Sequence, residues 1–387
     1  MNYIDLFAGA GGLSEGFIRV GFNPIAHVEM NKDACDTLKT RAAYHWLIEN
    51  KKKKIYTDYL KSDNKNKEEF WKKNIPDSVI NSVINTEISK ETLPNIFKKI
   101  DNELGKNKID LIVGGPPCQA YSVAGRARKD MSNDPRNTLY LHYVKFLEKY
   151  QPKMFVFENV PGILSAKNGK HLENILKAVT EAGYEVSLPT NKNRFLNAKD
   201  FGVLQDRKRV IIIGWKKELG LTYPEFETKE NNFQVLKDLF ADLKPLKNGE
   251  GTLNAVEYLK PTTEYLKQAK IRNGLNIVTQ HIARPNNEND LEIYRIAVDE
   301  WNNGKRLNYA KPPERLITHS NTKVFTNRFQ VVNGHGVSHT VVAHIAMDGH
   351  YYIHPDKKQN RSITVREAAR IQSFPDDYFF EGSRTSA

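Results

Sequence analysis

A cysteine at the end of a predicted buried strand is the residue in this sequence best suited to covalent chemistry. Cys118 follows Gly-Gly-Pro-Pro at 114–117, which itself follows 109–113, an apolar run rich in β-branched residues that predicts a strand. At the carboxyl end of a strand in an open parallel sheet, where ligands bind, its thiol could act as a nucleophile. The alternative is a small buried thiol in a turn, and the motifs that follow argue against it.

A carboxyl group is expected close to this thiol. The run 154–157 predicts the next buried strand, and it ends at Glu158, with Asn159 and Val160 after it. Because the carboxyl ends of parallel strands meet at one edge of a sheet, Cys118 and Glu158 should share that edge. A basic cluster, Gln-Asp-Arg-Lys-Arg at 205–209, then precedes a further strand at 210–215.

A glycine-rich turn near the N-terminus predicts a nucleotide-binding unit. The strand 3–7 runs into Ala-Gly-Ala-Gly-Gly-Leu-Ser-Glu-Gly at 8–16 and then into a helical pattern. Glycines at such a turn let the backbone approach a ligand closely. Ser14 breaks the G-x-G-x-x-G spacing, which weakens a dinucleotide interpretation. Glu29, at the tip of a second strand at 24–28, suits hydrogen bonds to ribose hydroxyls.

Alternating strands and helices up to about residue 215 predict an α/β domain, and the polar, irregular chain beyond it predicts a second, smaller one. We place the boundary between 1–222 and 223–387. Residues 51–80 are rich in lysine and asparagine and read as an inserted surface segment. Five histidines between 335 and 354 match no usual ligand spacing, so no metal site is predicted. The other predicted elements are helices at 32–50, 138–150 and 365–371 and a strand at 82–84.

Composition narrows the class of protein. A net charge of +12 and a pI of about 9.3 are typical of proteins that meet polyanions. No stretch approaches the ~18 consecutive apolar residues of a membrane span, and the first residues lack the layout of a signal peptide. Two cysteines in 387 residues do not make a disulfide framework. We therefore expect a reducing, cytoplasmic compartment, with Cys35 as a structural thiol and Cys118 free to react.

Taken together, these motifs closely resemble the cytosine-C5 DNA methyltransferases, of the bacterial restriction-modification type. The resemblance rests on Asp-Leu-Phe-Ala-Gly-Ala-Gly-Gly at 5–12, Pro-Pro-Cys-Gln at 116–119, Glu-Asn-Val at 158–160 and Gln-Asp-Arg-Lys-Arg at 205–209. The run 361–375 is similar to that family's ninth motif. The resemblance covers the chain apart from 51–81 and about 225–330. It implies a Rossmann-like sheet of the S-adenosylmethionine-dependent methyltransferases, with a target-recognition domain.

The resemblance implies S-adenosylmethionine as cofactor. Phe7 would pack on the adenine, Glu29 would hold the ribose hydroxyls, and Pro117 and Leu139 would line the adenosine pocket. Glu87 is our choice for the acidic residue at the adenine amino group, with Asn85 and Asp58 as alternatives. The remaining expected cofactor residues are Ala8, Gly9, Gly11, Gly12, Leu13 and Met30.

The implied reaction begins when the Cys118 thiolate adds to C6 of cytosine, which makes C5 nucleophilic towards the methyl group. Glu158, protonated or sharing a proton, would hydrogen-bond N3 and the exocyclic amine. Arg207 would bind O2 of the base, and Arg209 a nearby phosphate or the catalytic loop. The base that removes the C5 proton is not identified and could be water.

The substrate implied is double-stranded DNA with the target cytosine flipped out. The basic loop 119–137 would close over it. Gln119 would enter the vacated position, and Ser122 and Arg126 would also contact DNA. Thr340, in a pair that resembles the family's Thr-Leu, would support the backbone of the flipped nucleotide. The recognised sequence would be read by about 225–342.

One departure and two alternatives accompany the resemblance. The family's last motif, an Asn-containing segment that completes the methionine pocket, would follow Ala387, so we expect a truncated chain or a separate polypeptide that supplies it. The alternatives are the tRNA-methylating branch, which has Cys-Phe-Thr after the prolines instead of Cys-Gln-Ala, and a non-catalytic DNA-binding protein. Our main hypothesis is a sequence-specific DNA methyltransferase that protects host DNA from a cognate restriction enzyme.

Overall fold

The computed structural model describes residues 1–63, 65–117, 135–192, 194–310, 312–317 and 326–383, apart from the side chains of 135, 136 and 344. The described chain forms two compact units. The first comprises Met1–Lys52, Lys67–Asn197 and Lys208–Glu227, and the second comprises Lys53–Asn66, Ala198–Arg207 and Thr228–Ala387. The second unit therefore includes two segments from before the predicted boundary at 222.

The first unit is built on an eight-stranded sheet with the order β3-β2-β1-β4-β5-β9-β6, with β7 paired to β9. Strands β1 to β5 are mutually parallel, and β9 runs antiparallel to both β5 and β6. All six predicted strands are confirmed with small shifts of their ends. The strands are β1 (Asn2–Leu6), β2 (Asn23–Glu29), β3 (Val83–Asn85), β4 (Leu111–Gly114), β5 (Met154–Asn159), β6 (Tyr184–Ser187), β7 (Leu196–Asn197) and β9 (Lys208–Lys216).

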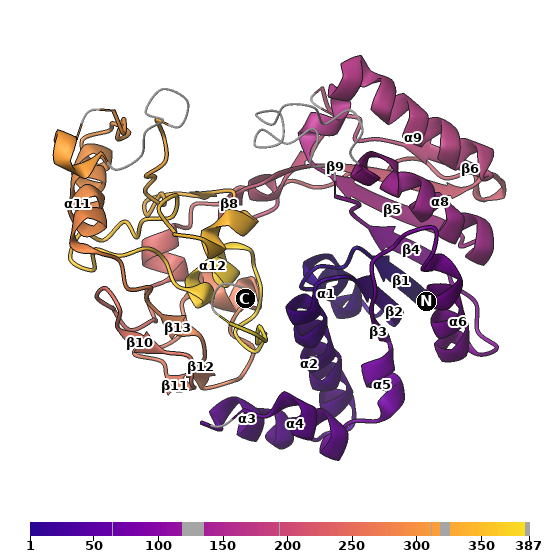
Figure 1. The fold of residues 1–387 in the computed structure, drawn as a ribbon, viewed down its shortest axis with the longest axis horizontal. Helices are drawn as coiled ribbons and strands as arrows, with labels where there is room; N and C mark the ends of the chain where they lie inside the picture. The colour runs from indigo at the N-terminus through magenta and orange to yellow at the C-terminus, as the bar shows by residue number, and fades with distance from the viewer. Residues whose placement is uncertain (64, 118–134, 193, 311, 318–325, 384–387) are drawn as a thin grey trace. The chain divides into compact units, whose positions relative to one another are not determined.

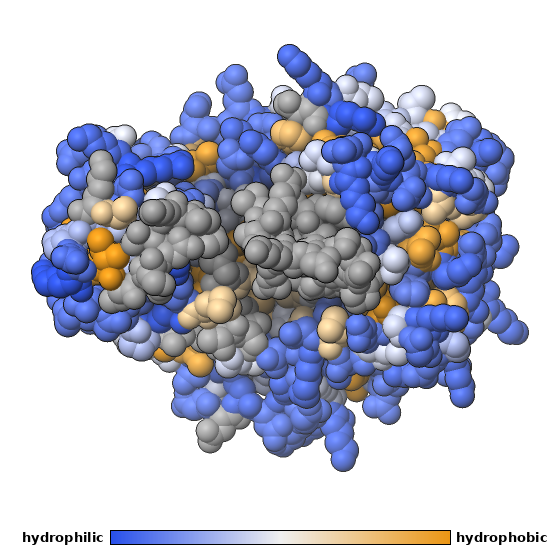
Figure 2. Space-filling model, turned by 45° about the horizontal axis from the view of Figure 1, so that its top comes forward, coloured by the Kyte–Doolittle hydropathy of each residue, from blue (hydrophilic) through white to orange (hydrophobic). Residues whose placement is uncertain are grey.

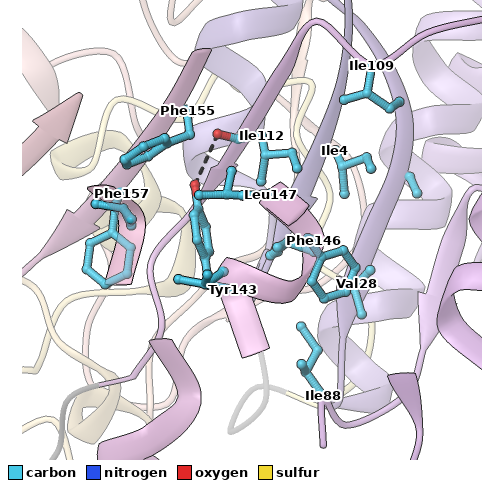
Figure 3. Close-up of a cluster of buried hydrophobic side chains, with 14 of the residues drawn as sticks. Ile4, Val28, Ile88, Ile109, Ile112, Tyr143, Phe146, Leu147, Phe155 and Phe157 are labelled. Atoms are coloured by element: carbon cyan, nitrogen blue, oxygen red, sulfur yellow. Dashed lines mark hydrogen bonds between the residues drawn. The ribbon is translucent and has the colours of Figure 1, made fainter. Parts of the chain in front are cut away.

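Helices cover both faces of this sheet (Figure 1), because each strand carries apolar side chains on both sides. On one face, α6 (Leu93–Leu104), α8 (Leu139–Tyr150) and α9 (Lys170–Glu181) build the larger core. Figure 3 shows its centre, where the Tyr143 hydroxyl donates to the carbonyl of Ile112 at 3.1 Å. On the other face lie α1 (Gly12–Arg19) and α2 (Lys32–Glu49).

Residues 51–80 are not the surface insertion that the sequence suggested. They form α3 (Lys53–Lys61), α4 (Lys67–Asn74) and α5 (Asp77–Asn81), and the chain passes from one unit to the other between them. Aromatic side chains are buried on these helices although lysine dominates the composition. Tyr56 and Tyr59 belong to the core of the second unit, while Phe70 and Trp71 are buried in the first. Burial of a few aromatic side chains therefore packs these helices against the cores, although most of their residues are polar.

The second unit contains short strands and three α-helices besides α3 within its described residues. Helix α11 (Glu288–Asn302) lies in a stretch that showed no periodicity in sequence, and α10 (Glu264–Gln268) precedes it. Helix α12 (Val365–Ile371) matches its prediction and begins with a capping box between Thr364 and Glu367. The paired strands are β10 (Gly251–Thr252) with β13 (His281–Ile282), β11 (Val256–Glu257) with β12 (Ile277–Val278), and β8 (Gln205–Asp206) with β14 (Ser338–His339).

The surface formed by the described residues is mainly polar. On the face in Figure 2 most described side chains are hydrophilic, and the apolar ones form small separate groups. No helix among the described residues is long and apolar enough to cross a membrane. Three of the C-terminal histidines have hydrogen-bond partners: His339 Nε2 with the Tyr351 carbonyl at 2.7 Å, His350 Nδ1 with the Tyr294 hydroxyl at 2.8 Å, and His354 Nδ1 with the Asp356 N–H at 3.1 Å. Within the described residues no cluster of His, Cys, Asp or Glu is arranged to hold a metal ion.

Candidate active site

A carboxylate and a guanidinium meet at the edge of the sheet where β5 ends. Arg209 Nε lies 2.5 Å from Glu158 Oε1, and both side chains are partly exposed, at 18% and 27%. The antiparallel pairing of β9 with β5 sets Glu158 opposite Ile211, so the first residues of β9 lie beside the last residues of β5. The pair is therefore fixed by strand register and remains open to solvent.

Two glycines at the end of β4 make room for this pair. A Cβ on Gly115 would lie 2.8 Å from Glu158 Oε2 and 3.1 Å from the Glu158 carbonyl oxygen. A Cβ on Gly114 would lie 2.5 Å from the Leu6 carbonyl oxygen of β1. Distances below about 3 Å leave no space for a methyl group, so Gly114 must be glycine, while a methyl group at 115 would force the Glu158 carboxylate to move. The Gly-Gly pair thus allows β4 to end tightly between its two neighbours.

Asn159 holds the turn that leads towards Cys118. Its side-chain amide is buried and donates to the Pro116 carbonyl at 3.0 Å, while its Oδ1 accepts the backbone N–H of Val160 at 2.9 Å. The residue after the carboxylate on β5 therefore fixes the backbone two residues before the cysteine. No role for Asn159 was predicted from the sequence. Its position next to Glu158, facing a Pro-Pro turn that cannot donate backbone hydrogen bonds, is the signal that could have indicated one.

The glycine-rich turn after β1 has the backbone shape of a ligand-binding loop. Phe7, Gly9 and Gly11 all have positive φ, of 57°, 54° and 84°. A Cβ on Gly9 would meet nothing within 4 Å, so the backbone there is open to a ligand. Glu29 is oriented towards this loop, since its Oε2 accepts the Gly9 N–H at 2.9 Å and its Oε1 accepts the Asn31 N–H at 2.8 Å.

The remaining predicted cofactor residues lie at the same edge of the first unit. Met30 follows β2 and is 64% exposed, Pro117 follows β4 and is exposed, and Leu139 begins α8. The rest of the glycine loop joins β1 to α1: Ala8 is buried, and Gly12 and Leu13 open the helix.

The three candidates for the adenine contact separate in the structure. Glu87 is exposed two residues beyond β3. Asn85, at the end of β3, donates to the Met30 carbonyl at 2.9 Å and so lies directly beside the tip of β2. Asp58 is on α3 in the second unit, where it pairs with Lys54 on the surface.

Arg207 lies in the second unit, where β8 runs beside β14. Its Nη1 donates to the Val341 carbonyl at 3.3 Å, and the Thr340 hydroxyl donates to the Asp206 carbonyl at 2.5 Å. The side chain of Gln205 accepts the Val341 N–H at 3.2 Å. The basic motif therefore holds the segment that contains Thr340. The guanidinium beside Glu158 is that of Arg209, whereas the sequence analysis assigned the base contact to Arg207.

Four predicted residues, Cys118, Gln119, Ser122 and Arg126, lie outside the described residues. The other cysteine is described and fits its structural role. Cys35 is 1% exposed, its Sγ donates to the Glu29 carbonyl at 3.3 Å, and burial raises the pKa of its thiol to about 12. A thiol with such a pKa is protonated at neutral pH and is a poor nucleophile.

Comparisons with known proteins agree with these motifs. The family described as C-5 cytosine-specific DNA methylase matches residues 1–387. Type II methyltransferase M.Bpa9945I of Bacillus paralicheniformis is 42% identical over 100% of this chain and 94% of its own. M.DdeI of Desulfomicrobium norvegicum, also a type II methyltransferase, is 31% identical over 100% of this chain and 81% of its own.

A solved structure has a similar fold. It is a crystal structure from E. coli whose description assigns it as a DNA modification methyltransferase encoded within a prophage. It aligns with a TM-score of 0.60 at 23% identity and covers 98% of this chain and 90% of that one. At this identity the similarity supports the α/β fold with its mixed central sheet.

Proposed function

Because the chain belongs to the C-5 cytosine-specific DNA methylase family and is a DNA cytosine-5 methyltransferase of the restriction-modification type, we propose the finer details of its reaction. The methyl donor is S-adenosylmethionine, the substrate is a cytosine flipped out of a specific duplex sequence, and Cys118 forms a covalent adduct at C6. Methylation at that sequence protects host DNA from a cognate restriction enzyme.

The observation that carries this proposal is the Glu158–Arg209 pair at the end of β5, with Asn159 bound to the turn before Cys118. The Glu158 carboxyl and the Arg209 guanidinium lie together at one edge of the sheet. The strand before the Pro-Pro-Cys motif, β4, ends at the same edge. Such groups can hydrogen-bond the polar edge of a base while a thiolate attacks the ring.

In the proposed reaction the Cys118 thiolate adds to C6, and the ring electrons move towards C5 as the sulfur–carbon bond forms. Glu158, protonated or sharing a proton, donates a hydrogen bond to N3 and accepts one from the exocyclic amine, which stabilises the charge that develops on the ring. S-adenosylmethionine supplies an electrophilic methyl group, which C5 accepts. A base, or water, then takes the C5 proton, and the carbon–sulfur bond breaks to release the thiolate. The products are a 5-methylcytosine in the DNA and an enzyme with its Cys118 thiolate restored.

The contacts of the two arginines support a different proposal from the one made from the sequence, which gave O2 of the base to Arg207 and a phosphate or the catalytic loop to Arg209. Arg209 is the guanidinium in contact with Glu158, so we assign it to O2 of the base. Arg207 donates to the Val341 carbonyl, so we assign it to positioning the segment that contains Thr340, which supports the backbone of the flipped nucleotide. Because a guanidinium carries five N–H donors, Arg209 can bind the Glu158 carboxylate through Nε and a neighbouring base oxygen through another N–H.

The glycine loop fits the proposed methyl donor. The open backbone at Gly9 and the left-handed conformation of Phe7 leave room for a flat adenine beside the loop. Each carboxylate oxygen of Glu29 accepts one backbone N–H and keeps a lone pair available for a ribose hydroxyl. These residues would hold the adenosine part of the donor, while the contacts of its methionine part are not assigned.

Transfer of tritium from methyl-labelled S-adenosylmethionine to mixed-sequence duplex DNA tests the activity, with incorporation at 5-methylcytosine identified after hydrolysis. We expect label in DNA and none in tRNA. A second measurement uses a duplex with 5-fluorocytosine at the target, which traps the adduct because fluorine cannot be removed as a proton. The wild-type chain should form a covalent complex, and Cys118→Ala should form none. An adduct that survives in Cys118→Ala would place the nucleophile elsewhere, and no transfer by the wild-type chain would contradict the proposed function.

A further inference from the structure

We propose that Ser14 and His27 are positioning residues for the methyl donor, because their buried contact fixes the first turn of α1, and with it the glycine loop, to the tip of β2. The inference rests on the proposed function of that loop. Neither side chain would touch the donor, since Ser14 is 2% exposed and His27 is 3% exposed. Their effect would pass through the backbone from Gly9 to Gly12.

The glycine loop has little local structure to hold it in place. Helix α1 spans Gly12–Arg19, only eight residues, and its N-cap is Gly11, in a left-handed conformation, with no side-chain capping hydrogen bond. An eight-residue helix is marginal in isolation, and a glycine N-cap, which has no side-chain acceptor, costs roughly a few tenths of a kcal/mol relative to Ser or Asp. The glycines before it add backbone freedom. The position of the first turn must therefore come from contacts with the rest of the unit.

Ser14 provides such a contact with the sheet. Its hydroxyl lies 2.8 Å from His27 Nε2 and is also hydrogen-bonded to the Tyr3 hydroxyl. Tyr3 is on β1 and His27 on β2, so one hydroxyl in the first turn of α1 joins both central strands. A serine hydroxyl offers one proton and two lone pairs, and the carboxyl of Asp5 interacts with it as well.

The next residue anchors the same turn to α2. The Glu15 carboxylate binds Arg41 through Nε at 2.9 Å and Nη2 at 2.6 Å, and it also contacts His45 Nε2 at 3.2 Å. Glu15 and Arg41 are almost fully buried. Consecutive residues of α1 are thus held on two sides, by the sheet through Ser14 and by α2 through Glu15. The first turn of α1 is fixed by buried polar contacts instead of by a cap.

The tip of β2 holds the glycine loop at both of its ends. Glu29 accepts the Gly9 N–H where the loop begins, and His27, two residues earlier on the same strand, binds Ser14 where the loop has passed into the helix. Because residues i and i+2 share one face of a strand, a single rigid element sets both points. Loss of one contact would let the loop sample other conformations, and donor binding would then carry the cost of ordering it.

His27 is chemically suited to this contact. Burial lowers the pKa of its imidazole to about 4, so the ring is neutral near pH 7 and can donate or accept at Nε2 according to its tautomer. Asp5 lies opposite it in the β1–β2 register. Breaking a buried hydrogen bond leaves its partner unsatisfied, so the Ser14 hydroxyl should stay bound as long as His27 is present.

Four variants of the full chain test the inference. His27→Leu and Ser14→Ala remove the contact. His27→Gln keeps an amide near Nε2, and His142→Leu is a matched control on α8. Binding of S-adenosylmethionine and S-adenosylhomocysteine is measured by titration calorimetry, and KM for donor, KM for DNA and kcat are measured separately. We expect His27→Leu and Ser14→Ala to weaken donor binding about tenfold, with KM for DNA and kcat nearly unchanged. His27→Gln should recover most of the affinity, and His142→Leu should match the wild type.

Amide hydrogen exchange at residues 8–14 provides a readout that needs no catalysis and no donor. Exchange there should accelerate in His27→Leu and Ser14→Ala, while exchange in β4 and β5 stays as in the wild type. Unchanged loop exchange and unchanged donor affinity in a folded His27→Leu would overturn the inference. Weakening of donor and DNA alike, or uniform acceleration of exchange, would overturn it too, since it would indicate general destabilisation. A wild-type chain that transfers no label would instead contradict the proposed function, while the exchange measurement would still test the positioning of the loop.

Discussion

Arg209 Nε and Glu158 Oε1 are 2.5 Å apart because β9 runs antiparallel to β5. In a fully parallel sheet the residues before a strand lie at the opposite edge from those that end its neighbour, so Arg209 and Glu158 would be separated by the length of the strands. The antiparallel strand returns its first residues to the edge where β1, β2, β4 and β5 end. The catalytic carboxylate proposed here therefore depends on the direction of β9 for its partner.

Arg209→Ala should lower kcat for methyl transfer by about 10²–10³-fold, because it removes a donor aimed at developing charge. Arg209→Lys should recover only part of this loss, since an ammonium lacks the planar fork of a guanidinium. Single-turnover transfer of labelled methyl groups measures the chemical step directly. Arg207→Ala serves as the comparison and should raise KM for DNA more than it lowers kcat. A larger effect of Arg207→Ala on the single-turnover rate would restore the original assignment.

Gly115→Ala should lower kcat by up to about 10²-fold while the protein stays folded, because small displacements of catalytic groups cost rate steeply. The added methyl group would lie 2.8 Å from Glu158 Oε2, so the carboxylate must move. Gly16→Ala is the matched control, since nothing lies within 4 Å of its Cβ position. Activity and melting temperature are measured for both. Wild-type activity in Gly115→Ala would show that the carboxylate tolerates displacement.

Asn159→Asp should impair the turn before Cys118, because a carboxylate cannot donate to the Pro116 carbonyl that Asn159 now binds at 3.0 Å. We expect a loss of about 1–3 kcal/mol in unfolding free energy from the unpaired buried groups, together with slower adduct formation on 5-fluorocytosine DNA. Denaturant titration and gel analysis of the adduct provide the two measurements. Normal adduct kinetics in a destabilised Asn159→Asp would limit the residue to a structural role.

Tyr59→Phe should destabilise the second unit by about 1–3 kcal/mol, because its hydroxyl donates to the buried Glu381 carboxylate at 2.7 Å. Tyr56→Phe removes a 2.6 Å hydrogen bond to the Asp377 carbonyl and should cost about 1 kcal/mol. Lys54→Ala, on the same helix, breaks a surface ion pair and should change stability by less than about 1 kcal/mol. Denaturant unfolding of the full chain distinguishes these values. Equal effects in all three variants would mean that α3 is not anchored through its tyrosines.

Individual strands and helices could be predicted where the signal lies within the element's own sequence. The strands β1, β2, β4 and β5 are short apolar runs with turn residues after them, and α12 carries its own capping box. The direction of β9 was not predictable, because it depends on pairing with β5 rather than on its own sequence. The packing of α3 was missed for a similar reason, since Tyr56 contacts a residue 321 positions away. Long-range contacts of this kind leave no periodic signal.

His354, in the second unit, is a buried histidine whose titration should be visible in stability, as should that of His27 in the first unit. It is 1% exposed, and its Nδ1 accepts the Asp356 N–H at 3.1 Å. Burial, reinforced by the nearby Arg361 guanidinium and only partly offset by Glu367, lowers the pKa of the imidazole from 6.5 to about 4. The unfolded chain therefore binds a proton at a higher pH than the folded protein does.

Stability from this group should be complete above about pH 6.5 and should fall as the pH drops towards 4, by up to about 3 kcal/mol. His354→Asn retains an acceptor for the Asp356 N–H but cannot bind the proton, so its stability should be less sensitive to acid. Because the substitution also removes the buried ring, the variant should be less stable than the wild type at pH 7.5. Denaturant unfolding at several pH values between about 7.5 and 4.5 measures both slopes. The same acid sensitivity in His354→Asn would assign the loss to other groups, with His281 the nearest candidate, because burial lowers its pKa as well.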